Sequence, residues 1–275
     1  MELTRESLAK MIDHTVLAAH TTEDKIMKLC NEALEYGFFS VCVNPYWTSY
    51  VARRLEGTEV KVCVVAGFPL GANTTKIKAQ EAALAVAEGA HEVDMVLNVG
   101  AMRDQKHDIV RDDIRAVKEA VAGRLLKVIL ETCYLTDEEI VKACELAVEA
   151  GADFVKTSTG MGIYGAFPDH IRLMRQTVGP HIGVKASGGI SNFKDAHRAI
   201  LAGASRLGCS ASLSVIEGLS LYQLAPEAWL EPEIPCHFCP QRYANANKMP
   251  KALYMYHTRK CSACQYRELY NKYYK

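Results

Sequence analysis

The chain has 275 residues, of which 49% are hydrophobic, and its 32 basic residues (Lys and Arg) balance 32 acidic ones (Asp and Glu). This length suits one barrel-sized domain, or a barrel of roughly 230 residues with a small appendage. The balanced charge excludes a strong overall attraction to nucleic acid or to an anionic membrane, so a small molecule is the expected partner. The N-terminal ten residues are charged, and no apolar stretch of about 18 residues follows. We therefore expect a cytoplasmic protein with no membrane partner.

Short apolar, β-branched runs alternate with longer helical patterns along most of the chain. The runs predict eight strands, over residues 11–17, 40–44, 60–66, 92–99, 126–132, 154–158, 182–186 and 206–210. The clearest helical patterns lie between them, over residues 76–88, 112–121, 137–149 and 192–201. Strict alternation implies parallel strands joined by helical crossovers, hence an α/β fold. Eight such strands predict a (β/α)8 TIM barrel.

A weak internal repeat supports the barrel. Four expected helices end at a glycine that precedes a strand, namely Gly37, Gly89, Gly151 and Gly203. Glycine suits the left-handed residue that often terminates a helix. Five residues further on, along the second, fourth, sixth and eighth strands, lie Cys42, Asp94, Lys156 and Gly208. Alternate strands of a barrel contribute to one interior layer, so these four residues should meet. An acid and a lysine in a layer that is usually apolar indicate a functional site.

Lys156, in an apolar strand, is the candidate nucleophile. Burial would lower its pKa, and a neutral amine can attack a carbonyl to form a Schiff base. Lys185, on the next strand, would disfavour protonation of Lys156 by charge repulsion, and it would also relay protons. Asp94 should pair with a lysine, because an isolated buried charge is prohibitive. The alternatives are a lysine at a strand end that reaches solvent, and purely structural ion pairs at Lys185 and Asp94.

Two glycine turns predict a phosphate site. Gly188 and Gly189 follow the seventh strand and open a helix, and Gly208 and Ser210 follow the eighth. Backbone N–H groups at such turns can approach an anion, and barrels commonly bind phosphate in these two loops. A single glycine turn often has no ligand-binding role. Here both turns follow the two strands after which barrels commonly bind phosphate.

Six collinear motifs resemble the deoxyribose-phosphate aldolase family. They cover residues 12–17, 41–45, 67–71, 92–96, 156–160 and 184–190, and the similarity extends from about Leu8 to about Leu219. The resemblance implies a class I aldolase that reversibly cleaves 2-deoxy-D-ribose 5-phosphate to acetaldehyde and D-glyceraldehyde 3-phosphate, with no cofactor for catalysis. Its partners would be a small phosphorylated sugar and an aldehyde, and a homo-oligomer stays open.

The resemblance also implies roles for individual residues. Lys156 would form the Schiff base, and Asp94 and Lys185 would relay protons. The expected substrate-binding residues are Asp13, Thr15, Cys42 and Thr159, of which Cys42 is expected as pocket lining. The expected phosphate-binding residues are Gly160, Gly188, Gly189, Gly208 and Ser210. The family often has two consecutive serines after the eighth strand, whereas here Ala211 follows Ser210, which puts one phosphate contact in doubt.

Two other functions stay open at this point. One is a Schiff-base aldolase for a different phosphorylated sugar, which would keep Lys156 and the glycine turns. The other is a non-catalytic barrel that acts as an adaptor through its cysteine-rich tail; the intact set of Lys156, Lys185 and Asp94 argues against it.

The last 51 residues have no counterpart in the motifs, so we expect a barrel over residues 1–224 and an extension over residues 225–275. The extension holds two C-x2-C pairs separated by 21 residues, Cys236 with Cys239 and Cys261 with Cys264. This spacing lies just beyond the common interval of about 15–20 residues for zinc sites. Four thiolates in a short segment nevertheless predict a tetrahedral structural zinc site without an open position for substrate. Redox-active pairs, or cysteines buried independently, are the alternatives.

Overall fold

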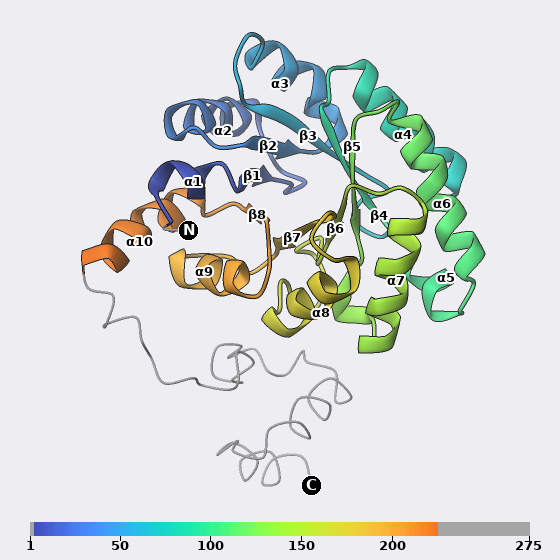
Figure 1. Cartoon of the computed structure of the whole chain (residues 1–275). Helices are drawn as coiled ribbons and strands as arrows, with labels where there is room; N and C mark the ends of the chain where they lie inside the picture. Colours follow the sequence, from blue (N-terminus) through green and yellow to red (C-terminus); the bar gives the residue numbers. More distant parts are fainter. Residues whose placement is uncertain (1–2, 225–275) are drawn as a thin grey trace, which may run out of the picture. The chain divides into compact units, whose positions relative to one another are not determined.

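A computed structural model describes residues 3–224, which form a closed barrel of eight parallel strands (Figure 1). Each strand pairs with the next in chain order, and β8 pairs with β1. The strands are β1 (Ile12–Val16), β2 (Ser40–Val43), β3 (Lys61–Ala66), β4 (Glu92–Val96), β5 (Leu125–Ile129), β6 (Phe154–Lys156), β7 (Gly183–Ser187) and β8 (Arg206–Cys209). The predicted (β/α)8 barrel is confirmed.

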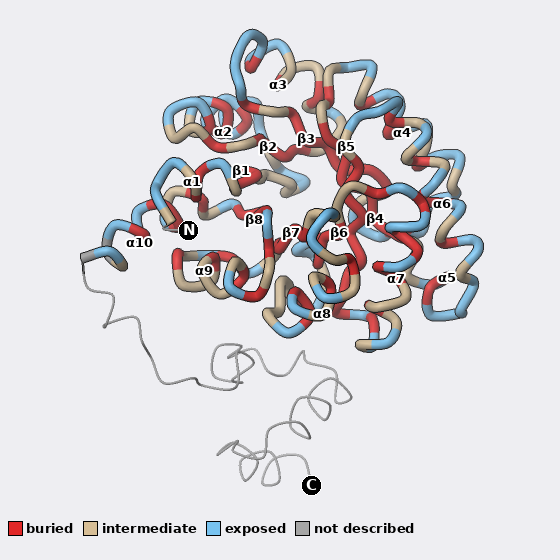
Figure 2. The backbone as a smooth tube through the Cα atoms, in the orientation of Figure 1, coloured by how far each residue is buried: buried red, intermediate tan, exposed pale blue. Residues whose placement is uncertain are grey.

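Helices surround the barrel on its outside (Figure 1). They are α1 (Arg5–Ala9), α2 (Glu23–Tyr36), α3 (Thr48–Arg54), α4 (Thr75–Ala87), α5 (Val99–Arg103), α6 (His107–Ala120), α7 (Asp137–Glu149), α8 (Pro168–Val178), α9 (Phe193–Leu201) and α10 (Ser212–Leu224), with short 3-10 helices η1 (Pro45–Trp47) and η2 (Thr132–Tyr134). The strands are buried, and the helices expose one face to solvent (Figure 2). Burying the apolar faces of strands and helices against each other provides the main stabilisation of such a fold.

The glycines that were expected to end helices take the left-handed conformation. Their φ angles are 67° at Gly37, 107° at Gly89, 84° at Gly151 and 109° at Gly203. Because each helix therefore ends at a fixed distance before its strand, the count of residues from glycine to barrel interior is the same on all four even-numbered strands.

The largest errors in the predicted strands are at the C-terminal ends of β4 and β5, each of which was predicted three residues too long. The chain leaves β4 at Val96 and begins α5 at Val99, and it leaves β5 at Ile129 before the turn at Glu131. The apolar runs continue beyond the strands because these residues stay buried after the hydrogen-bonded ladder ends: Leu97 and Leu130 are both fully buried. Hydrophobic pattern alone does not mark where a buried strand stops.

The barrel interior carries charged side chains in each of three successive layers of inward-facing residues. The lowest layer, from the even-numbered strands, holds Ser40, Glu92, Phe154 and Arg206. The next, from the odd-numbered strands, holds Asp13, Cys63, Lys127 and Lys185. The third holds Cys42, Asp94, Lys156 and Gly208, the set that the sequence placed together. The charged residues of these layers form one connected network.

Among residues 3–224, no helix has both the length and the apolar composition needed to cross a membrane. The extension expected over residues 225–275, with its four cysteines and the zinc site predicted for them, lies outside the described residues.

Candidate active site

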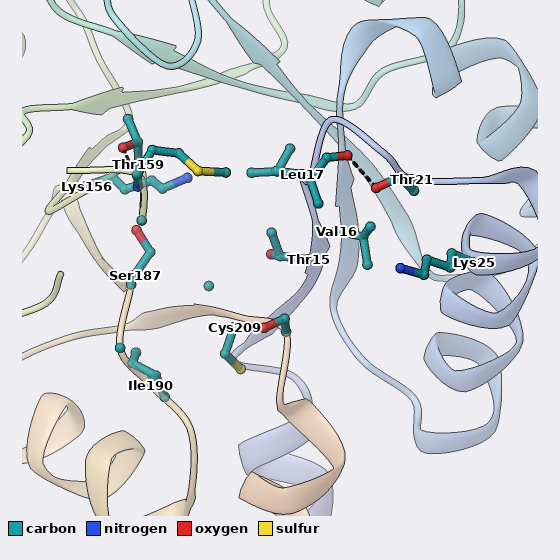
Figure 3. Close-up of a pocket in the computed structure, with 17 residues that line it drawn as sticks. Thr15, Val16, Leu17, Thr21, Lys25, Lys156, Thr159, Ser187, Ile190 and Cys209 are labelled. Carbon is teal, nitrogen blue, oxygen red and sulfur yellow. Dashed lines mark hydrogen bonds between the residues drawn. The ribbon is translucent and has the colours of Figure 1, made fainter. Parts of the chain in front are cut away.

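Lys156 is the last residue of β6, and its amine reaches the open end of the barrel. Strand alternation turns Phe154 and Lys156 inward and Val155 outward. The Lys156 side chain is 3% exposed, and its Nζ lies 2.7 Å from Oδ2 of Asp94. Figure 3 shows the side chain extending from β6 toward Leu17 and Thr15, across the pocket. The amine therefore meets both a buried carboxylate and the space that a ligand would occupy.

Asp94 is the centre of the charged network. Its Oδ2 accepts hydrogen bonds from Nζ of Lys156 at 2.7 Å and Nζ of Lys185 at 2.8 Å. Its Oδ1 accepts from Nζ of Lys127 at 2.8 Å and from the Cys63 thiol at 3.2 Å. Burial alone would raise the pKa of Asp94, but the three lysine charges outweigh it and hold the pKa well below its usual range. The expected pairing of Asp94 with a lysine is confirmed, and Asp94 pairs with three lysines.

Lys185 is fixed between two carboxylates. It is the register partner of Lys156, and it contacts Oδ2 of Asp13 at 2.5 Å as well as Asp94. Burial acts against its charged form, but Asp13 and Asp94 outweigh that effect and raise the pKa of Lys185. Lys185 therefore stays protonated at neutral pH and is held between the carboxylates of Asp13 and Asp94.

Three charged residues that the sequence analysis did not single out complete the network. Lys127 Nζ lies 2.5 Å from Glu92 Oε2. Arg206 Nη1 lies 3.3 Å from the same Glu92 oxygen and 2.8 Å from Oδ1 of Asp13. All three are buried. The signal that identified Lys156, a charged residue in an apolar strand, also marks Lys127 in β5.

A pocket of about 510 Å³ opens above this network at the carboxyl ends of the strands. Most of the predicted ligand-binding residues line it, namely Thr15, Lys156, Thr159, Gly160, Gly188, Gly189, Gly208 and Ser210. The loops after β1, β6, β7 and β8 thus meet around one space. This end is where barrels place their ligand sites.

Two predicted substrate-binding residues lie elsewhere. Asp13 is fully buried in the layer below Lys156, where Arg206, Lys185 and the Ser40 hydroxyl contact its carboxylate. Cys42 is also fully buried and packs beside Cys63 instead of lining the pocket. Both face the barrel interior, which the sequence indicated for Cys42 alone, and both lie at depths that the pocket does not reach.

The glycine turns shape the wall of the pocket. Gly160, Gly188 and Gly189 have φ angles of 84°, 82° and 78°, so their amides take directions that other residues rarely allow. A Cβ on Gly188 would lie 2.9 Å from Cα of Gly165 and 3.2 Å from Cα of Gly160, which shows that the β6–α8 and β7–α9 loops are in contact. The two turns therefore form one continuous surface.

Gly208 serves the network as well as the pocket. A Cβ at this position would lie 2.9 Å from Cε of Lys185. Glycine here leaves the space through which the Lys185 side chain reaches Asp13 and Asp94.

Comparisons with known proteins agree with this geometry. Residues 7–219 match the family model described as DeoC/LacD family aldolase. The chain is 56% identical over 211 residues to a deoxyribose-phosphate aldolase of Clostridium tetani, covering 76% of this chain and 98% of that protein. It is 59% identical over 212 residues to one of an Exiguobacterium species, covering 77% and 96%. A solved deoxyribose phosphate aldolase from Aeropyrum pernix superposes with a TM-score of 0.74 at 35% identity, covering 79% of this chain and 92% of that one. The chain belongs to the DeoC/LacD family of aldolases.

Proposed function

We propose that this aldolase reversibly cleaves 2-deoxy-D-ribose 5-phosphate to acetaldehyde and D-glyceraldehyde 3-phosphate through a Schiff base on Lys156. The observation that carries the proposal is the Lys156 amine at the base of the pocket, 2.7 Å from a buried carboxylate that two other lysines also contact. The relatives named above, at 56% and 59% identity, are deoxyribose-phosphate aldolases.

The network places one of its amines at the pocket. Three carboxylates (Asp13, Glu92 and Asp94) face four cationic groups (Lys127, Lys156, Lys185 and Arg206). Of the three lysines, Lys156 is the one that lines the pocket. It is therefore the amine that can attack an aldehyde bound there.

In the cleavage direction, Lys156 attacks C1 of the open-chain sugar, and loss of water gives a protonated imine. The imine draws electrons from the C2–C3 bond as the C3 hydroxyl loses its proton, which releases D-glyceraldehyde 3-phosphate and leaves an enamine. Protonation of C2 and addition of water then release acetaldehyde and restore the amine. We assign the proton movements to Asp94 and Lys185 with a water molecule, since Asp94 contacts Lys156 directly. No cofactor is needed for these steps.

We assign the phosphate to the glycine turns. Gly160, Gly188 and Gly189 and the Ser210 hydroxyl line the same pocket as Lys156. Backbone N–H groups at such turns can bind an anion without the cost of moving a side chain. Phosphate bound there would fix the sugar chain so that C1 meets the amine.

Borohydride reduction in the presence of acetaldehyde, followed by peptide mass mapping, tests the mechanism. We expect one reduced adduct, on Lys156. A screen of other phosphorylated sugars then separates the proposed substrate from those of other Schiff-base aldolases. A chain that forms no adduct and cleaves no sugar phosphate would instead support the adaptor function.

Three further assignments complete the proposal. We place the protein in the cytoplasm, consistent with a metabolic enzyme. The Aeropyrum pernix relative is described as tetrameric, which supports a homo-oligomer here. We also retain a structural zinc on Cys236, Cys239, Cys261 and Cys264, supported by the spacing of the two C-x2-C pairs.

A further inference from the structure

Glu131 takes up an unusual position directly after β5. Its backbone is left-handed, with φ 53° and ψ 60°, a conformation that is costly for a residue other than glycine. Its side chain is buried, so the protein also bears the cost of placing a carboxyl group out of water. Burial raises the pKa of Glu131, an effect that hydrogen bonds from Thr159 and the charge of Lys156 partly offset. Two such costs at one residue, beside the pocket, point to a function.

The Glu131 carboxylate binds one residue of the β6–α8 loop at three points. The Thr159 amide N–H donates to Oε1 at 3.2 Å and to Oε2 at 3.3 Å, and the Thr159 hydroxyl donates to Oε2. The same hydroxyl accepts from the Met161 amide at 3.0 Å. The Thr159 hydroxyl thus has partners within the protein, as a donor to Glu131 and an acceptor from Met161.

The loop also packs directly on Glu131. A Cβ on Gly162 would lie 3.2 Å from Cδ of Glu131 and 2.6 Å from Sγ of Cys133, so the chain passes over the carboxylate with no space to spare. Thr159 and Gly160 line the pocket, and Gly160 lies against Gly188 of the facing turn. A continuous path therefore connects Glu131, through Thr159, to the glycine turns.

We propose that Glu131 is a positioning residue for the anionic end of the substrate: its carboxylate holds Thr159, and thereby sets the Gly160 turn against the Gly188 turn at which phosphate binds. This inference rests on the proposed function and extends it to a residue that does not line the pocket. Glu131 is not proposed to contact substrate or to transfer a proton.

Two variants separate positioning from structural support. Glu131→Ala removes all three contacts, whereas Glu131→Gln keeps one carbonyl acceptor for the Thr159 amide and an NH2 group that can donate to its hydroxyl. For Glu131→Ala we expect kcat/KM for 2-deoxyribose 5-phosphate to fall at least about tenfold, the effect of losing one hydrogen bond to a charged group. We expect kcat/KM for unphosphorylated 2-deoxyribose to fall less. The effect on the phosphorylated sugar should appear mainly as a higher KM. Glu131→Gln should restore part of the lost kcat/KM. Glu138→Ala, an exposed carboxylate on α7, is the matched control and should match the wild type.

A double-mutant cycle with Thr159→Val tests the route. Thr159→Val removes the hydroxyl contact but keeps the two amide contacts. If Glu131 acts through Thr159, adding Thr159→Val to Glu131→Ala should therefore cost little more than Glu131→Ala alone. Additive effects would overturn the proposal in favour of a structural role. So would an equal fall in kcat/KM for the phosphorylated and the unphosphorylated sugar in Glu131→Ala, with Glu131→Gln folded. Acetaldehyde with borohydride should still label Lys156 in every variant. Absence of that label in the wild-type protein would refute the proposed function instead, so the two failures are distinguishable.

Discussion

Replacement of Asp94 by Asn is the most informative single change in the network. Asp94 neutralises three lysines, but Lys185 keeps Asp13 at 2.5 Å and Lys127 keeps Glu92 at 2.5 Å after the change. Among residues 3–224, Lys156 alone of the three loses its only ion pair. Breaking a buried ion pair costs about 3–5 kcal/mol, and the retained partners place the expected loss of unfolding free energy near the lower end, about 3 kcal/mol.

The same change should slow the chemistry more than it weakens binding. If Asp94 moves protons, kcat should fall by about 10²–10⁴-fold, the usual contribution of general acid–base catalysis, with little change in KM. The three lysine charges hold the pKa of Asp94 well below 3.8, the ordinary value for an aspartate. Its stabilising effect is thus fully present above that value and is lost only as the pH falls through the lower, folded-state pKa. The stability difference from wild type should accordingly be constant between about pH 5 and 8.

Urea unfolding followed by circular dichroism, and steady-state kinetics with 2-deoxyribose 5-phosphate, measure the two effects. The matched control is Asp104→Asn, an exposed aspartate that contacts Lys106 and should affect neither quantity. A normal kcat in a folded Asp94→Asn protein would reduce Asp94 to a structural partner. An unchanged unfolding free energy would refute the charge argument itself.

Three further changes test the rest of the site and the tail. Lys156→Leu leaves three cations against three carboxylates, so the protein should fold while losing both turnover and the borohydride-trapped adduct; an adduct on Lys185 would reverse the assignment. Gly189→Val places a side chain in the pocket wall where φ is 78° and should abolish the kinetic preference for phosphorylated over unphosphorylated deoxyribose; an unaltered preference would locate the anion elsewhere. Metal analysis should find about one zinc per chain, lost on the double change Cys236→Ser and Cys264→Ser; metal-free wild-type protein would refute the zinc site.

The barrel and its central layer could be predicted because local rules determine them. The helix-ending glycines and the period-two alternation of strands together determine which residue of each even-numbered strand faces inward. Counting five residues from the glycine therefore brought Asp94 and Lys156 together correctly. Counting three residues instead gives Ser40, Glu92, Phe154 and Arg206, the lowest layer, so the same rule could have found two charged partners that were overlooked.

Other features lie outside this count of residues. Lys127 lies four residues after Gly123 on an odd-numbered strand, so the count does not transfer to it. The depth of Asp13 and Cys42 below the pocket depends on how the loops after the strands close over the barrel. Glu131 was expected within a strand, and a left-handed glutamate cannot be recognised from its neighbours, because it is the surrounding contacts that hold the backbone there.

The interior carboxylates and cations contact one another across the strands of the barrel. Each carboxylate contacts cations from at least two other strands: Asp13 meets Lys185 and Arg206, Glu92 meets Lys127 and Arg206, and Asp94 meets three lysines. Removing a carboxylate leaves a buried cation with fewer partners, whereas apolar replacement of a whole set of buried ion pairs is often neutral for folding. Stability alone therefore does not explain why charged residues occupy the interior of this barrel. Their retention around Lys156 is best explained by the chemistry of an amine that must gain and lose a proton in every cycle.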